Sequence, residues 1–244
     1  MKYDVIVLGS GPGGYVTAIR ASQLGLKTAI IEREELGGIC LNWGCIPTKA
    51  LLKSANVFEY IQHADAYGIK VSSSEADFGA MVGRSRDVAD GMSKGVTFLL
   101  KKNKVDVIMG SGKVLTGKRI EVKANDGGTQ VLEASNIIIA TGARSRELPN
   151  LKQDGKKIIG YREALTLKTQ PKKMVVVGSG AIGVEFAYFY NAIGTDVTVV
   201  EYMDSIVPVE DKEIGKQLGR SLKKQGISIK TSSEVTSVDT SGSG

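Results

Sequence analysis

The chain has 244 residues, of which 42% are hydrophobic and 24% charged, and its mean hydropathy is −0.03. This length and composition exclude a minimal peptide module, a disordered chain and a linker protein. The formal net charge is +6 at pH 7, but the lysines are scattered and form only short clusters such as Lys101–Lys102 and Lys223–Lys224. We therefore favour a solvated basic surface over a surface that binds nucleic acid.

Membrane insertion and secretion are not indicated. The longest aliphatic runs, such as residues 5–8, are about four residues long, far short of the ~20 that a membrane helix needs. The first residues lack a basic segment, a long apolar stretch and a cleavage site, so we expect a cytoplasmic protein. Two cysteines are too few for a disulfide framework, and a close pair in a reducing compartment is more often catalytic or metal-binding than structural.

The first predicted strand, residues 5–8, runs into GSGPGG at residues 9–14, a G-x-G-x-x-G pattern. A helix is predicted over 15–24, and a second strand over 29–31 ends in Glu32. In such a unit Gly9 permits the tight turn, Gly11 lets backbone approach a pyrophosphate and Gly14 lets the helix pack on the strand. The acid then accepts hydrogen bonds from ribose. These features predict a dinucleotide site.

Both cysteines lie in residues 37–52, with the sequence GGICLNWGCIPTKALL. Cys40 and Cys45 are too few ligands for a structural zinc site, and no histidine cluster completes one, so we predict no metal. Pro47 in a first-turn position predicts a helix that starts beside Cys45, where the helix dipole favours a thiolate. The pattern therefore indicates a reactive cysteine pair rather than two buried apolar residues.

Helical patterns follow over 49–67 and 78–103, and His63 is predicted to be a surface residue. A buried strand over 105–109 is predicted to end in a glycine turn at 110–112. Residues 113–132 are predicted to form an antiparallel meander.

The second half of the chain repeats the first pattern. A strand at 174–177 runs into GSGAIG at 178–183, a helix is predicted over 184–193, and a strand at 197–200 ends in Glu201. The acid follows the third glycine by 18 residues in both repeats, since 32 − 14 and 201 − 183 are equal. A carboxylate here would repel a 2′-phosphate, so the second site should prefer NAD over NADP. A helix over 211–225 and strands at 227–229 and from 234–235 complete the prediction.

The two glycine turns around GGxCLNxGCxPxK resemble the two-dinucleotide, disulfide-containing flavoprotein reductases, the class I pyridine nucleotide-disulfide oxidoreductases, and among them most closely the dihydrolipoamide dehydrogenases. The resemblance covers the whole chain, which matches about the N-terminal half of a family member. It implies an α/β fold with two Rossmann-like dinucleotide-binding domains. An FAD-binding domain with the redox disulfide would span 1–145, and a truncated NAD-binding domain 146–244. The C-terminal interface domain of the family, with its His–Glu pair, has no counterpart here.

The resemblance also implies residue roles. Cys40 and Cys45 would form the redox disulfide, with Cys40 exchanging with substrate and Cys45 contacting the flavin. Lys49 matches a lysine near the reactive nitrogen of the flavin, and Glu185 matches its ion-pair partner. The implied cofactor-binding residues are Gly9, Gly11, Gly14 and Glu32 for FAD, Gly178, Gly180, Gly183 and Glu201 for NAD, and further Arg33, Gly38, Lys49, Gly112, Thr141 and Gly142.

The activity implied by the resemblance is oxidation of protein-bound dihydrolipoamide to lipoamide, with electrons passing through the disulfide and FAD to NAD. The implied partners are a lipoyl domain of a 2-oxo-acid dehydrogenase complex and, in the full-length parent, a second copy in a homodimer, with no nucleic acid and no membrane. Two alternatives stay open: a non-catalytic fragment that binds FAD or a nucleotide, and a related reductase of the glutathione or mercuric type. Trp43 departs from the family, in which a small aliphatic residue is commoner.

Overall fold

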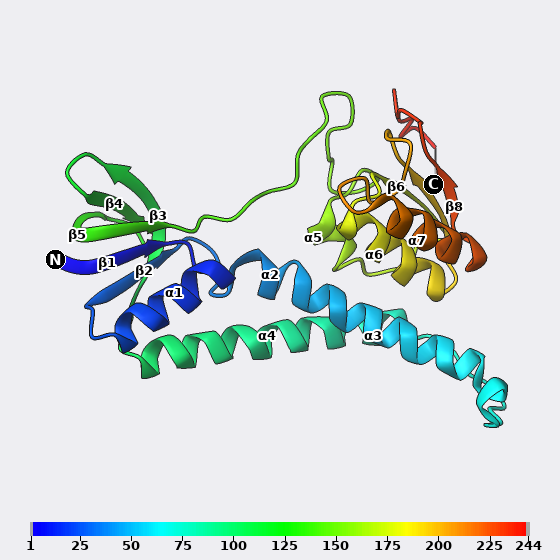
Figure 1. Ribbon diagram of the computed structural model, residues 1–244, viewed down its shortest axis with the longest axis horizontal. Helices are drawn as coiled ribbons and strands as arrows, with labels where there is room; N and C mark the ends of the chain where they lie inside the picture. The colour runs from blue at the N-terminus through cyan, green and yellow to red at the C-terminus, as the bar shows by residue number, and fades with distance from the viewer. Residues whose placement is uncertain (1, 243–244) are drawn as a thin grey trace. The chain divides into compact units, whose positions relative to one another are not determined.

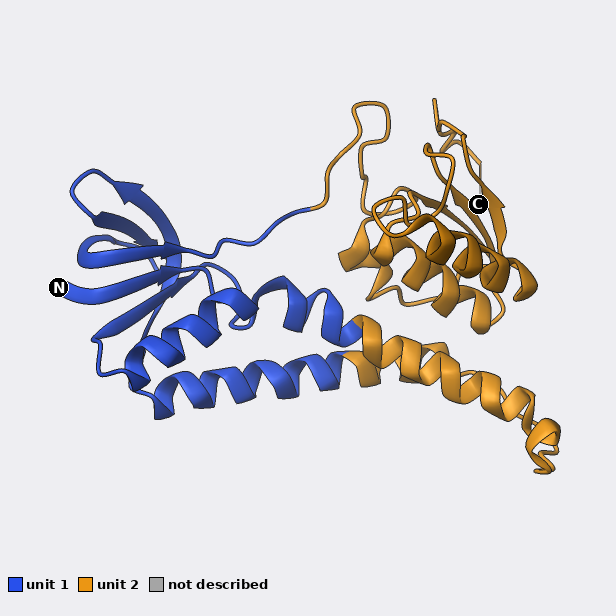
Figure 2. Cartoon of the chain, viewed as in Figure 1, with its two compact units in different colours: residues 1–47, 86–144 blue, residues 48–85, 145–244 orange. Residues whose placement is uncertain are grey.

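The computed structural model describes residues 2–242 and divides into two compact units (Figure 2). Unit 1 holds the residues up to 47 and residues 86–144, whereas unit 2 holds residues 48–85 and those from 145 onward. Helices α3 (Cys45–Gln62) and α4 (Phe78–Lys102) each begin in one unit and continue in the other. The division into FAD and NAD domains at residue 145 concerns function and stays a prediction.

Unit 1 is built on a closed barrel of five strands (Figure 1). The strands are β1 (Lys2–Leu8), β2 (Thr28–Glu32), β3 (Asp106–Leu115), β4 (Arg119–Ala124) and β5 (Thr129–Ile139). Strand β1 pairs in parallel with β2 and β5, and β2 pairs in parallel with β3. Strands β3, β4 and β5 form the antiparallel meander expected from the sequence. Every residue of β2 is buried, as is typical of a central parallel strand.

Two apolar cores fill unit 1, one on each face of its parallel strands. Helices α1 (Pro12–Gln23) and α4 cover one face, where Ala18 of α1 and Leu100 of α4 pack with Val7 of β1. The meander covers the other face, where Ile31 of β2 packs with Ile120 of β4. Alternate residues of the same strands supply the two cores because strand side chains point to opposite faces.

Unit 2 contains a parallel sheet in the order β6 (Lys173–Val177), β7 (Asp196–Val200), β8 (Ser228–Lys230). Its other elements are η1 (Ala64–Tyr67), α5 (Tyr161–Ala164), α6 (Ala181–Ala192) and α7 (Lys212–Lys224). Helix α6 buries Phe189 and Tyr190, whose ring centroids lie 5.0 Å apart edge to face, against Val197 and Val199 of β7. The predicted α/β fold is therefore confirmed, with a mixed barrel in one unit and a parallel sheet in the other.

Two predictions about strands are wrong. The strand expected to be buried over 105–109 and to turn at 110–112 continues as β3 to Leu115, because Gly110 and Gly112 serve close packing inside a strand. Val107 and Met109 of this strand are exposed rather than buried. A Cβ on Gly110 would lie 2.5 Å from the Lys123 carbonyl oxygen. The strand expected from 234–235 is not formed. The carbonyls of Val235 and Thr236 accept hydrogen bonds from the Asn150 side-chain amide.

Candidate redox and dinucleotide sites

A disulfide joins Cys40 of α2 (Gly38–Asn42) to Cys45, the first residue of α3. The two Cα atoms lie 4.7 Å apart. Cys45 is an exposed residue and Cys40 is partly buried. Because Cys45 is at the N-terminus of the 18-residue helix α3, the positive end of the helix dipole lies there and would favour a thiolate after reduction.

The segment before the disulfide is seated on the first glycine turn. A Cβ on Gly38 would lie 2.7 Å from the Gly11 Cα, so glycine is required for this approach. The Gly37 amide donates to the Ser10 carbonyl over 3.1 Å. The Asn42 side-chain amide donates to the carbonyls of Leu36 and Gly38, each over 3.0 Å, and closes the segment on itself. The segment that carries the disulfide and the first turn therefore lie in direct contact in unit 1.

The three glycines of the first turn differ in whether the protein's own backbone and packing require a glycine at that position. Gly9 has φ +99°, a left-handed conformation that favours glycine. A Cβ on Gly14 would collide with the Gly9 carbonyl oxygen, so Gly14 is required for the helix to approach the turn. A Cβ on Gly11 would meet nothing within 4 Å. The protein's own packing thus explains Gly9 and Gly14, whereas Gly11 leaves a surface that a ligand can approach.

The second turn repeats this arrangement in unit 2. Gly178 has φ +94°, and a Cβ on Gly183 would collide with the Gly178 carbonyl oxygen. A Cβ on Gly180 would again meet nothing within 4 Å. Helix α6 begins directly after Gly180, as α1 begins directly after Gly11, so each open glycine lies at a helix N-terminus where free amides favour a phosphate.

The two predicted acids are buried and each is held by a serine of its own glycine turn. The Ser10 amide and hydroxyl donate to Glu32 Oε2 over 2.9 and 2.6 Å. The Ser179 amide and hydroxyl donate to Glu201 Oε2, both over 2.7 Å. Both serines are fully buried. Sequence reasoning missed them, although both turns begin with Gly-Ser-Gly and the repeated serine was the available signal.

The hydrogen bonds favour the ionised form of Glu201. Burial alone would raise the pKa of its carboxyl, but backbone donation from Met203 and Ser179, with the Ser179 hydroxyl, outweighs burial and holds the pKa below its usual value. A carboxylate that stays ionised accepts hydrogen bonds and repels a neighbouring phosphate. Glu201 therefore has the electrostatic character that the sequence argument required for discrimination against NADP.

Helices α3 and α6 meet in unit 2 through two polar contacts. The Lys49 ammonium lies 2.5 Å from Glu185 Oε1. The Tyr188 hydroxyl donates to Glu59 Oε2 over 2.5 Å. Burial, followed by this hydrogen bond to Glu59, raises the pKa of Tyr188 to about 12. The Tyr188–Glu59 contact was not predicted from the sequence.

The remaining predicted site residues lie in three places. Arg33 is exposed directly after β2, and its amide donates to Glu32 Oε1 over 2.8 Å. Gly112 lies within β3, and a Cβ there would lie 2.5 Å from Leu8 Cδ1. Thr141 and Gly142 follow β5, and both are exposed. His63, predicted at the surface, is exposed.

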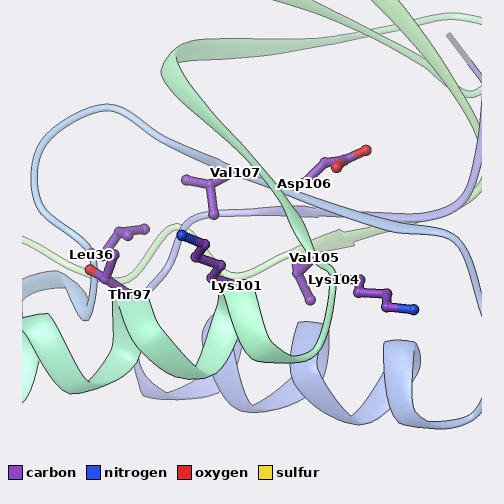
Figure 3. A pocket seen from close by; sticks show the side chains of 7 residues that line it. All are labelled: Leu36, Thr97, Lys101, Lys104, Val105, Asp106 and Val107. Atoms are coloured by element: carbon purple, nitrogen blue, oxygen red, sulfur yellow. The ribbon is translucent and has the colours of Figure 1, made fainter.

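A hollow of about 420 Å³ lies elsewhere in unit 1, beside the end of α4 and the start of β3 (Figure 3). None of the predicted site residues lines it; the lining residues are Leu36, Thr97, Lys101, Lys104, Val105, Asp106 and Val107.

Within residues 2–242, no group of three His, Cys, Asp or Glu side chains is arranged to hold a metal ion. None of the helices in these residues combines the length and the apolar character that crossing a membrane requires.

Comparisons with known proteins agree along the whole chain. The family profile "Pyridine nucleotide-disulphide oxidoreductase" matches residues 3–243. A dihydrolipoyl dehydrogenase of Zymomonas mobilis is 51% identical over 96% of this chain and 50% of its own length. A leghemoglobin reductase of Vigna unguiculata is 47% identical over 99% of this chain and 46% of its own length. The chain spans about half the length of the curated relatives it matches.

Solved structures show the same relationship. The crystal structure of LpdA from Mycobacterium tuberculosis matches with a TM-score of 0.89 and 30% identity, over 100% of this chain and 54% of that one. The Cu(II) complex of the HOCl-induced flavoprotein disulfide reductase RclA from Escherichia coli matches with a TM-score of 0.82 and 26% identity, over 98% of this chain and 51% of that one.

Proposed function

This chain belongs to the pyridine nucleotide-disulphide oxidoreductase family, and we propose that it supplies the redox disulfide and two Rossmann-like dinucleotide sites of a dihydrolipoyl dehydrogenase. The proposed reaction oxidises dihydrolipoamide, carried on a lipoyl domain of a 2-oxo-acid dehydrogenase complex, and reduces NAD. The observation that carries the proposal is the Cys40–Cys45 disulfide seated on a glycine turn. The full-length protein would act as a homodimer in the cytoplasm.

The residues of the first turn fit FAD. Gly11 leaves open space at the N-terminus of α1, where a pyrophosphate would accept hydrogen bonds from backbone amides. Gly9 and Gly14 would maintain that turn, and Glu32 would face the ribose. Gly38, Arg33, Gly112, Thr141 and Gly142 are proposed as further contacts. FAD, when bound, would carry electrons between the disulfide and NAD.

The residues of the second turn fit NAD for the same reasons. Gly180 leaves open space at the N-terminus of α6, and Gly178 and Gly183 shape the turn. Glu201 would accept hydrogen bonds from ribose hydroxyls through the acceptor capacity that its protein donors leave. We assign FAD to residues 1–145 and NAD to residues 146–244 on this basis.

The chain's own chemistry is thiol–disulfide exchange. A substrate thiolate would attack Cys40 Sγ, breaking the disulfide and releasing Cys45 as a thiolate, and the second substrate thiolate would displace Cys40 and close the lipoamide disulfide. Two electrons pass from the substrate to the cysteine pair, and the two substrate protons go to Cys40 and to solvent. The position of Cys45 at the start of α3 would stabilise its thiolate. Lys49 is proposed to lie near the reactive nitrogen of the flavin, and Glu185 is proposed as its ion-pair partner.

Absorption spectroscopy of the purified chain tests the proposal. Flavin bands, with a new long-wavelength band after addition of a stoichiometric dithiol, would support FAD beside the Cys45 thiolate. In the full-length protein, Cys45→Ser should keep bound flavin and abolish dithiol-dependent NAD reduction. Retained turnover in that variant would overturn the assignment.

Two alternatives give different results in these experiments. A non-catalytic nucleotide-binding protein would bind flavin but show no dihydrolipoamide turnover even at full length. A glutathione or mercuric reductase would turn over its own substrate with NADPH. The ionised Glu201 favours NAD, because it would repel the 2′-phosphate of NADP.

A further inference from the structure

The redox segment, defined as residues 36–45, is held on α4 at two points within unit 1. The Ser93 hydroxyl donates to the Leu36 carbonyl over 2.8 Å. The guanidinium carbon of Arg86 lies 4.5 Å from the centre of the Trp43 ring. Arg86 and Ser93 are seven residues apart, about two helical turns, so they lie on the same side of α4. Helix α4 therefore contacts both the beginning and the end of the redox segment.

Trp43 links α4 to the part of the redox segment that lies between the two cysteines. It follows α2 directly and lies between the two cysteines in the chain. Its indole Nε1 donates to Glu35 Oε2 over 3.0 Å, and Arg86 covers its ring. A guanidinium over an indole face is attracted by the ring's quadrupole and packs closely as a planar group. The contact from Asn42 to Leu36, by contrast, joins residues of the redox segment to one another.

The buried position of the Arg86 guanidinium carries a free-energy cost. Its Nη1 is buried and has no hydrogen-bond partner among residues 2–242. A buried unsatisfied donor carries a desolvation cost, so this side chain would ordinarily extend into solvent. The stacking on Trp43 is a favourable contact that acts against that cost.

We propose that Trp43 and Arg86 are positioning residues that hold the redox segment on α4 while the disulfide is open. This inference rests on the proposed redox role of the disulfide. In the oxidised protein the covalent bond holds Cys40 near Cys45 whatever Trp43 does. In the reduced protein only non-covalent contacts hold the two thiols, and a contact that restrains them raises their effective concentration. The Trp43–Arg86 contact therefore favours re-formation of the disulfide.

A purely electrostatic role for Arg86 predicts the opposite sign. A fixed positive charge favours the thiolate that reduction creates, so removal of the charge alone would make the disulfide harder to reduce. Loss of the positioning contact would make it easier to reduce. The direction of the shift therefore separates the two interpretations.

The test is equilibration of the chain in buffers of reduced and oxidised dithiothreitol, followed by alkylation of free thiols and mass spectrometry. The protein disulfide and dithiothreitol exchange two electrons and two protons, giving the protein dithiol and the cyclic oxidised reagent. Arg86→Ala and Trp43→Val should each shift the equilibrium about three- to tenfold toward the dithiol, where tenfold equals about 30 mV. Lys94→Ala, which removes an exposed charge beside Ser93 on α4, should leave it unchanged.

Trp43→Phe provides a second control, because it keeps an aromatic face for Arg86 and removes the indole donation to Glu35. We expect this variant to stay within twofold of the wild type. The proposal is overturned if Arg86→Ala shifts the equilibrium toward the disulfide, or if neither Arg86→Ala nor Trp43→Val changes it. If circular dichroism shows that Arg86→Ala does not fold, the proposal is tested by the two Trp43 variants. It then requires a shift toward the dithiol in Trp43→Val and no such shift in Trp43→Phe. The measurement needs neither NAD nor lipoamide, so a failed proposed function would appear separately as absent turnover.

Discussion

The Lys49 ammonium and the Glu185 carboxylate, 136 positions apart in the sequence, lie 2.5 Å from each other and join α3 to α6 in unit 2. The lysine side chain is 61% exposed, and ion pairs with this degree of exposure contribute little to stability because water screens them. The sequence resemblance implied this pairing, whereas no periodicity or spacing in the chain connects residues so far apart.

We therefore expect Lys49→Met and Glu185→Gln each to change the free energy of unfolding by less than about 1 kcal/mol. Urea unfolding followed by circular dichroism measures this, with Lys53→Met, on an exposed position of the same helix, as the control. A loss above about 2 kcal/mol in either variant would mean that the pair is structural rather than retained for chemistry.

The glycine turns allow a matched comparison of two alanine variants. Gly14→Ala should destabilise unit 1 strongly, by about 2 kcal/mol or more, because its Cβ would collide with the Gly9 carbonyl oxygen. Gly11→Ala should leave stability within about 1 kcal/mol, since Gly11 has φ −62° and its Cβ would meet nothing within 4 Å. It should nevertheless weaken flavin binding, measured by absorbance of the purified protein. Normal flavin content in Gly11→Ala would contradict the assignment of this surface to the pyrophosphate.

The same comparison applies to the second turn. Gly180→Ala should fold normally and bind NAD more weakly, whereas Gly183→Ala should lose stability. Isothermal titration with NAD separates the two effects. Equal NAD affinity in Gly180→Ala and the wild type would place the nucleotide elsewhere.

The sequence predicted local features better than distant contacts. The turns, their glycine positions and the acids at the ends of the second strands followed from short patterns, because neighbouring residues determine them. The glycines at 110–112 were misassigned, since a glycine that ends a strand and one that allows close packing look alike in sequence. Trp43 stood out by its type, but its contact with Arg86 depends on how α4 packs and has no signal in either residue alone.

We expect the ionised Glu201 carboxylate to make the folded chain less stable as the pH falls into the acid range. Its pKa is lower in the folded chain than its usual value of 4.5, so the folded state favours the ionised form. The stabilising contribution is complete above about pH 4.5 and is lost as the pH falls through the lower folded-state pKa. Glu201→Gln should therefore unfold less steeply with falling pH than the wild type in this window. Urea midpoints between pH 3 and 7 measure the effect, and parallel curves for the two proteins would refute it.

We expect the neutral Tyr188 hydroxyl to make the folded chain less stable as the pH rises into the basic range. Its pKa is raised from 10.0 to about 12 by burial and by Glu59, so the unfolded chain releases this proton first as the pH rises. The contribution is complete below about pH 10 and is lost as the pH rises toward 12. Tyr188→Phe should lower stability at neutral pH by about 1 kcal/mol, through loss of the hydrogen bond to Glu59, and should flatten the decline above pH 10. Because Tyr3 also has its pKa raised to about 12, the decline should be reduced in Tyr188→Phe rather than abolished, and an unchanged slope would show that Tyr188 ionises alike in both states.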